Sequence, residues 1–185
     1  MNDSAIDPRI VANLFIERSR QDGFKVTNLS LQKLIYFAHG MFLLRHNSPL
    51  VSGYFEAWQY GPVHPLLYRE LKSNGRQSIV SQLVLKDIFS GEVRELAPPK
   101  DPAILEVVDL VVERYAKLPA SLLVSLSHAP GSPWAVVVDK ARTGVAIGGR
   151  ISDELIKERF RFHLSSVSAN SMLEPEFEDC PIKPN

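Results

Sequence analysis

The chain has 185 residues, and its 21 lysines and arginines are balanced by 21 aspartates and glutamates. A chain of this length can bury an ordinary core as one domain without disulfides or a structural metal. Its balanced charge provides no overall field that would attract nucleic acid or an anionic membrane. We expect a cytoplasmic protein, because there is no signal-peptide pattern and no apolar run long enough to span a bilayer.

The first predicted helix begins at Asp7 and Pro8, which suit the N-cap and first helical positions, and ends at Gly23. A second helix is predicted from about residues 27–30 to Asn47. It is apolar on nearly every side, which indicates a helix surrounded by protein. We expect one narrow stripe of this helix to face water, formed by the polar residues at every seventh position, Gln32, His39 and His46.

Residues 50–60 are aromatic and bounded by turn residues, which predicts a strand or an extended arm. A third helix is predicted to begin at Pro65 and to end at residues 73–75, which tolerate left-handed conformations. The pattern over residues 76–100 fits either a pair of strands or a short helix. The sequence does not decide between these two alternatives.

In the second half, Asp101 caps a long predicted core helix, and a shorter helix runs from Pro119 to His128. A loop is then predicted as far as Trp134, and Ser152 caps a last helix with an acidic first turn. The glycines at 144, 148 and 149 indicate turns, because their spacing does not fit a phosphate-binding loop.

Together these patterns predict a mainly α (α+β) fold, a single domain of about six helices with a small β element around residues 50–60. The domain is expected to cover residues 1–164. Residues 165–185 are acidic and poor in apolar side chains, which predicts a flexible tail. The sole cysteine, Cys180, lies in that tail, where neither a disulfide nor a catalytic thiol is expected.

The segment from Ser30 to Leu71 holds eight of the sixteen aromatic residues and ends in the stiff element Gly61–Pro65. Buried aromatics can serve as core or as anchors of a protein interface. We expect Trp58 to lie in the core and Tyr60 to be better placed at the surface. The Gly61–Pro65 element fits a recognition loop and a plain strand-to-helix connection equally well.

Two polar residues also have alternative roles. An unpaired ammonium is too costly to bury, so Lys33 must lie at the surface or be paired, and Glu56 is the partner that we predict. His128 follows a predicted helix and could donate to a partner, although a histidine there more often bonds the last carbonyls of the helix.

Several segments resemble one known family. LSLQKLIYFAHGMFLL resembles the LQKLLYF helix of the Panacea domain, also called the SocA-like antitoxin domain. FEAWQYGPVHPLLYREL is similar to that domain's EAW.YGPV.P.VY core. The resemblance continues through ILEVVDLVVERY, LSHAPGSPW and ISDELIKERF, and so covers roughly residues 6–162.

This resemblance implies an antitoxin of a bacterial or phage-associated toxin-antitoxin system that neutralises a cognate toxin by direct protein contact. In one branch of the family the antitoxin is also a proteolytic adaptor that delivers its toxin to a Clp-type protease. We expect no cofactor and no metal, because the residues of the aromatic segment supply neither a metal cage nor a phosphate cradle. The candidate partner contacts are drawn from the family positions present here: Lys33, Tyr36, Phe37, Glu56, Trp58, Tyr60, Gly61, Pro62, Val63, Pro65, Tyr68, His128 and Trp134.

Two other classes remain as alternatives. A hydrolase would need a histidine joined to a carboxylate in a pocket, and the sequence shows neither metal-ligand spacing nor a nucleophile elbow. A DNA-binding regulator would usually carry a basic stripe, whereas lysines and arginines are dispersed here. The sequence therefore favours a protein that binds another protein and is not an enzyme.

Overall fold

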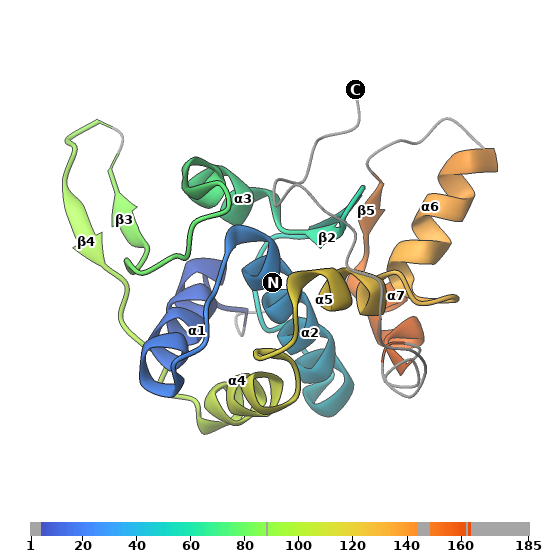
Figure 1. Ribbon diagram of the computed structural model, residues 1–185, viewed down its shortest axis with the longest axis horizontal. Helices are drawn as coiled ribbons and strands as arrows, with labels where there is room; N and C mark the ends of the chain where they lie inside the picture. The colour runs from blue at the N-terminus through green and yellow to red at the C-terminus, as the bar shows by residue number, and fades with distance from the viewer. Residues whose placement is uncertain (1–4, 88, 144–148, 162, 164–185) are drawn as a thin grey trace.

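The computed structural model describes residues 5–87, 89–143, 149–161 and 163. Within them the fold is mainly α with small antiparallel sheets (Figure 1). The elements in chain order are α1 (Pro8–Asp22), α2 (Asn28–His46), β1 (Phe55–Trp58), β2 (Gly61–Val63), α3 (Pro65–Leu71), the 3₁₀ helix η1 (Lys72–Asn74), β3 (Val84–Lys86), β4 (Val93–Glu95), α4 (Pro102–Tyr115), α5 (Ala120–Ser127), α6 (Pro133–Thr143), β5 (Arg150–Ile151) and α7 (Asp153–Arg159).

Helix α2 forms the centre of the molecule. It packs against α1, α3, α4, α5, α7 and strand β2 (Figure 1). Every residue from Asn28 to Leu43 is buried, as the apolar character of the helix on all sides predicts. Thr27 and Ser30 form a capping box at its start, and Asn47 ends it in a left-handed conformation.

The predicted polar stripe of α2 is wrong for two of its three members. His46 is exposed, but Gln32 and His39 are buried and hydrogen-bonded to other elements. The Gln32 side chain accepts from the backbone N–H of His64, and His39 Nε2 lies 3.2 Å from Asp153. These polar groups connect α2 to its neighbours, because a buried polar atom is stable only with a partner.

Strand β1 lies at the middle of a three-stranded antiparallel sheet of order β2-β1-β5. Trp58 pairs with Gly61 across the turn between β1 and β2, and Phe55 pairs with Ile151 of β5. Pro62 can sit in β2 because this strand is an edge of the sheet. The expected β element around residues 50–60 is therefore confirmed, with a partner strand that the sequence had not indicated.

A buried polar chain links α2, α5 and the end of the described chain. The carbonyl of Leu126 can only accept, so His163 donates to it from Nδ1 at 2.8 Å. Its Nε2 then accepts from the Tyr36 hydroxyl at 3.1 Å. Burial lowers the pKa of His163 to about 4 and raises that of Tyr36 well above its usual value. Both groups are therefore neutral at pH 7.

We expect Tyr36→Phe to lower the free energy of unfolding by about 2 kcal/mol, because it leaves His163 Nε2 buried without a donor. The matched control is Tyr54→Phe, since the Tyr54 side chain is exposed. Urea unfolding of the two variants measures the difference. Equal midpoints would show that the Tyr36–His163 bond contributes nothing to stability.

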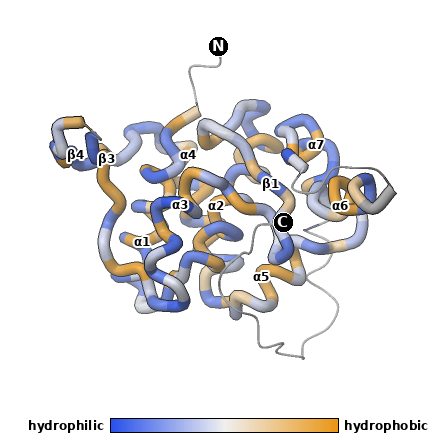
Figure 2. The backbone as a smooth tube through the Cα atoms, turned by 90° about the horizontal axis from the view of Figure 1, so that it is seen from above, coloured by the Kyte–Doolittle hydropathy of each residue, from blue (hydrophilic) through white to orange (hydrophobic). Residues whose placement is uncertain are grey.

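The undecided segment after α3 is a β-hairpin of strands β3 and β4, which we call the arm. In Figures 1 and 2 it stands off one end of the molecule. Figure 2 colours parts of α1 and α2 orange, which marks apolar residues, and both helices bury apolar side chains in the core. The predicted loop through Trp134 is wrong at its end, because α6 already begins at Pro133. The expected tail, residues 165–185, lies outside the described residues, as do Gly144 and Gly148.

Candidate functional site

The two motifs that carry the family resemblance meet around one lysine. Lys33 of α2 is fully buried, and its Nζ donates to the carbonyl oxygen of Pro62 in β2 at 2.9 Å. The preceding residue of α2, Gln32, binds the backbone N–H of His64 at 2.8 Å. Two adjacent side chains of α2 thus hold the backbone of this segment. Lys33 binds a carbonyl within β2, and Gln32 binds the amide of the residue that follows β2.

The predicted pair of Lys33 with Glu56 is wrong. No carboxylate among the described residues lies within ion-pair distance of Lys33, and Glu56 instead accepts from Trp58 Nε1 at 2.7 Å. Glu56 and Trp58 are two positions apart on β1, so their side chains share one face of the strand. Side chains two positions apart lie on the same face of a strand, so this pair could have been predicted from the strand pattern of the sequence.

The segment LSHAPGSPW reaches the same place from the second half of the chain. Trp134 Nε1 donates to the backbone carbonyl of Trp58 at 2.8 Å. The ring of His128 stacks on Trp134 with centroids 3.6 Å apart. We call the residues that meet here the Lys33 cluster: Lys33, Glu56, Trp58, Gly61, Pro62, Ser127, His128 and Trp134.

Gly61 makes this convergence possible. Its φ is +94°, and a Cβ atom there would lie 2.3 Å from Ser127 Oγ and 2.9 Å from Lys33 Cε. Contacts that short do not occur in folded proteins, so the turn can approach α2 and α5 only with glycine at this position. The Gly61–Pro65 element is in fact β2 followed directly by α3, whose first residue is Pro65.

The electrostatics of the Lys33 cluster are unusual for a structural site. Burial lowers the pKa of Lys33 to about 7, and one hydrogen bond to a carbonyl does not offset the lost hydration. Burial, followed by the positive charge of Lys33, lowers the pKa of His128 to about 4. His128 Nε2 is buried and has no hydrogen-bond partner within the described part of the chain.

The structure divides the candidate contacts into two sets. One set is buried and shapes the core: Lys33, Tyr36, Phe37, Trp58, Gly61, Pro62 and Val63. The other set is half-buried and reaches the surface: Glu56, Tyr60, Pro65, Tyr68, His128 and Trp134. Trp58 is in the core, as predicted, and its ring meets Tyr68 edge to face at 4.7 Å.

A hydrolase would need a histidine joined to a carboxylate in a pocket, and part of this arrangement is present, because His39 lies beside Asp153. The N–H of Val51 donates to His39 Nδ1, so Nε2 carries the proton and donates to Asp153. Asp153 lines a surface pocket of about 220 Å³, but the ring of His39 is only 2% exposed and packs edge to face on Phe55. This arrangement ties α2 to the start of α7.

The described residues contain no group of three or more His, Cys, Asp or Glu side chains placed to hold a metal ion. In the same part of the chain, no helix is both long enough and apolar enough to cross a bilayer.

The described residues thus form a mainly α fold around a buried aromatic framework, with half-buried tyrosines and a tryptophan at its margin. The family model described as "Antitoxin SocA-like, Panacea domain" matches residues 31–135. The chain is 43% identical to Antitoxin SocA of Caulobacter vibrioides (strain NA1000 / CB15N) over 177 residues, which is 96% of this chain and 94% of that protein. The chain therefore belongs to the SocA-like, Panacea-domain antitoxin family. No solved structure matches it.

Proposed function

We propose that this antitoxin acts in the cytoplasm by binding a cognate protein toxin directly, and that it does so without catalysing a reaction. The observation that carries the proposal is the 43% identity to Antitoxin SocA along nearly the whole of both chains. An antitoxin of this kind needs a surface that recognises a folded polypeptide. The half-buried set of candidate contacts supplies such a surface.

The binding surface that we propose is the aromatic rim, defined as Tyr60, Tyr68 and Trp134. All three surround Trp58: Tyr68 packs on its ring, Trp134 donates to its carbonyl, and Tyr60 lies in the turn that follows it. Tyrosine and tryptophan bury large areas at little entropic cost and are enriched among the residues that dominate binding energy.

The Lys33 cluster supports this surface from beneath. Because Lys33 and Gln32 hold the backbone of β2, and Trp134 is bonded to β1, the rim has few conformations to lose on binding. Rigid side chains bind more tightly, since less entropy is lost when the complex forms. A role in delivering the bound toxin to a Clp-type protease is a further part of the proposal and would use a separate surface.

Co-expression with the product of a neighbouring gene tests the proposal. We expect that gene alone to stop growth, the antitoxin to restore growth, and the two proteins to co-purify. We expect Tyr60→Ala to lose rescue, while Tyr54→Ala, which removes an exposed tyrosine outside the rim, retains it. Rescue without any complex would contradict direct binding, and full rescue by Tyr60→Ala would contradict the rim.

A further inference from the structure

The arm leaves the body in a direction set by hydrogen bonds at its base. The Asn13 side chain of α1 accepts from the N–H of Leu83 at 2.7 Å and donates to its carbonyl at 2.8 Å. Arg20 donates to the carbonyl of Val80, and the N–H of Ile79 donates to Val26 at 2.7 Å. Beyond this base, β3 and β4 pair with each other and form no sheet with the rest of the described chain.

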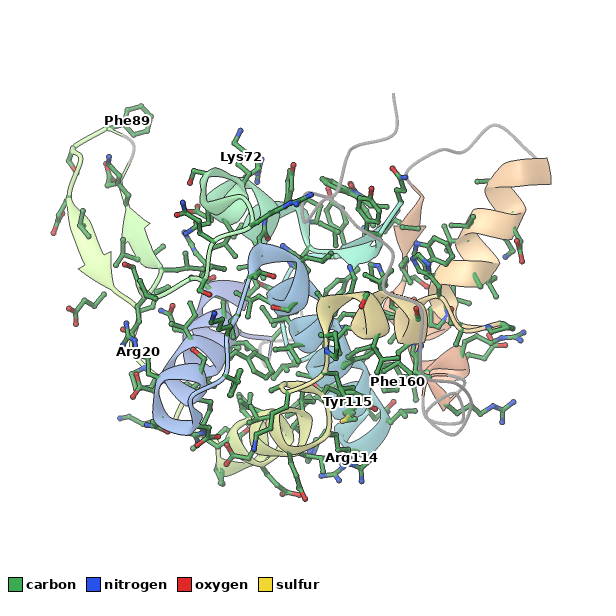
Figure 3. The ribbon with its side chains drawn as sticks, viewed as in Figure 1. Arg20, Lys72, Phe89, Arg114, Tyr115 and Phe160 are labelled. Carbon is green, nitrogen blue, oxygen red and sulfur yellow. The ribbon has the colours of Figure 1, made fainter. Side chains whose placement is uncertain are left out.

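Hydrogen bonds also connect the described residues at the tip of the arm. The carboxylate of Asp87 accepts from the N–H groups of Phe89 and Ser90 at 2.9 and 2.7 Å, and its carbonyl accepts from Gly91. These bonds hold Phe89 at the outermost point of the arm, where it is 99% exposed (Figure 3). An isolated two-stranded hairpin is only marginally stable in water, so pairing with a strand of a partner would stabilise the arm.

Along one edge of the arm, the backbone groups have no partner among the residues that the structure describes. The N–H of Asp87 donates to the carbonyl of Glu92 across the hairpin, so the backbone N–H and C=O groups of these two residues point toward each other's strand. Antiparallel pairs alternate, and Val93 and Glu95 therefore turn their N–H and C=O groups away from β3. Figures 1 and 2 both show β4 as the outer strand, so this edge faces away from the body.

We propose that a second copy of this chain pairs with that edge, so that two arms form a four-stranded antiparallel sheet with Val93 on the two-fold axis. In this register each Val93 exchanges two backbone hydrogen bonds with Val93 of the partner subunit. Val93 is 58% exposed in the single chain, and the pairing covers both copies of its side chain.

The charges of β4 are complementary to themselves in this register. Arg94 lies opposite Glu92 of the partner subunit, and Glu92 lies opposite Arg94 of the partner subunit. Within one chain Arg94 already bonds Glu92 at 3.0 Å, so both side chains lie on one face. The dimer thus places two positive and two negative charges in alternation across the shared edge, and opposite charges in facing positions stabilise a sheet.

The neighbouring registers are unfavourable. With Arg94 on the axis, Arg94 would face Arg94 of the partner subunit in a non-hydrogen-bonded pair. With Glu92 or Glu95 on the axis, a glutamate would face the same glutamate of the partner subunit. Like charges in facing positions destabilise a sheet. With Val93 on the axis, by contrast, the tip of each arm lies beside residues 96 and 97 of the other chain, which covers Phe89.

A second copy fits this edge better than an unrelated strand, because an open edge accepts any strand by its backbone and only charge selects among them. The contact is confined to the arms, so we expect a reversible dimer with a dissociation constant in the micromolar range. This inference is independent of the proposed function, because the arm is distinct from the aromatic rim.

Sedimentation velocity of the full chain between about 1 and about 300 µM tests the dimer. We expect the mass to rise from 20.7 kDa to twice that value. Arg94→Glu should weaken association at least tenfold, since it places glutamates opposite each other. The double variant Glu92→Arg/Arg94→Glu restores opposite charges in every facing position and should dimerise within about threefold of the wild type.

A proline variant separates the edge from the fold. Val93→Pro removes an N–H that points to solvent in the single chain, a position where an edge strand tolerates proline. We expect it to remain folded and monomeric. A wild-type protein that stays at 20.7 kDa at all concentrations, or a double variant that remains as weak as Arg94→Glu, would overturn the proposal.

Discussion

Gly61→Ala should be among the most destabilising single substitutions in this protein, with a loss of about 4 kcal/mol in the free energy of unfolding. The new Cβ would lie 2.3 Å from Ser127 Oγ and 2.9 Å from Lys33 Cε, and both of these side chains are fully buried. Overpacking of this kind costs about 1–3 kcal/mol, and a non-glycine residue at positive φ costs about 1–2 kcal/mol more.

Gly23→Ala is the matched control for Gly61→Ala. Gly23 also has a positive φ, +73°, but a Cβ there would meet nothing within 4 Å. It should therefore lose only about 1 kcal/mol, the conformational part of the effect. Chemical denaturation of both variants measures the two losses. If they are equal, the close approach of β2 to α2 and α5 is not what makes glycine necessary at position 61.

Lys33→Met should make the protein less sensitive to pH between 7 and 9. In the folded state burial lowers the pKa of Lys33 to about 7, whereas the unfolded chain keeps the usual 10.5. Across this window the unfolded state binds more protons, so wild-type stability rises with pH, by about 2 kcal/mol from pH 7 to pH 9. Methionine has no proton to bind, and the variant should lack this rise.

At pH 7 the buried amine costs the folded wild type about 4 kcal/mol relative to a neutral side chain. Methionine removes that cost but leaves the Pro62 carbonyl without its donor, which costs about 1–3 kcal/mol. We therefore expect Lys33→Met to be more stable than the wild type at pH 7, with the advantage shrinking toward pH 9. Lys117→Met, at an exposed position, should follow the wild-type curve, and parallel curves for all three proteins would show that Lys33 is not buried as described.

Much of the fold could be predicted from local signals. The two Asp-Pro starts, the cap at Thr27 and the stop at Gly23 indicated helices that the structure confirms, because these residues satisfy helix ends wherever the helix lies. Helix α6 was missed. Its run of valines lowers helix propensity, yet Ser132 accepts from the N–H of Ala135 and Pro133 occupies the first helical position, a start signal that was present.

The site was predictable in content but not in its internal connections. The motif residues do converge, but the sequence could not show that a backbone carbonyl, rather than Glu56, receives the Lys33 ammonium. Every residue has a carbonyl, so composition carries no signal for such a partner. The burial of His39 was missed for a similar reason, since its partners Val51 and Asp153 come from distant segments.

Titration calorimetry with the purified product of the toxin gene measures whether the aromatic rim binds a toxin. We predict a defined stoichiometric complex that Tyr60→Ala weakens at least about thirtyfold, the effect typical of an interface hot spot. Tyr54→Ala should bind as the wild type does, and both variants should keep the wild-type unfolding midpoint. A folded Tyr60→Ala protein that binds toxin with undiminished affinity would contradict the account.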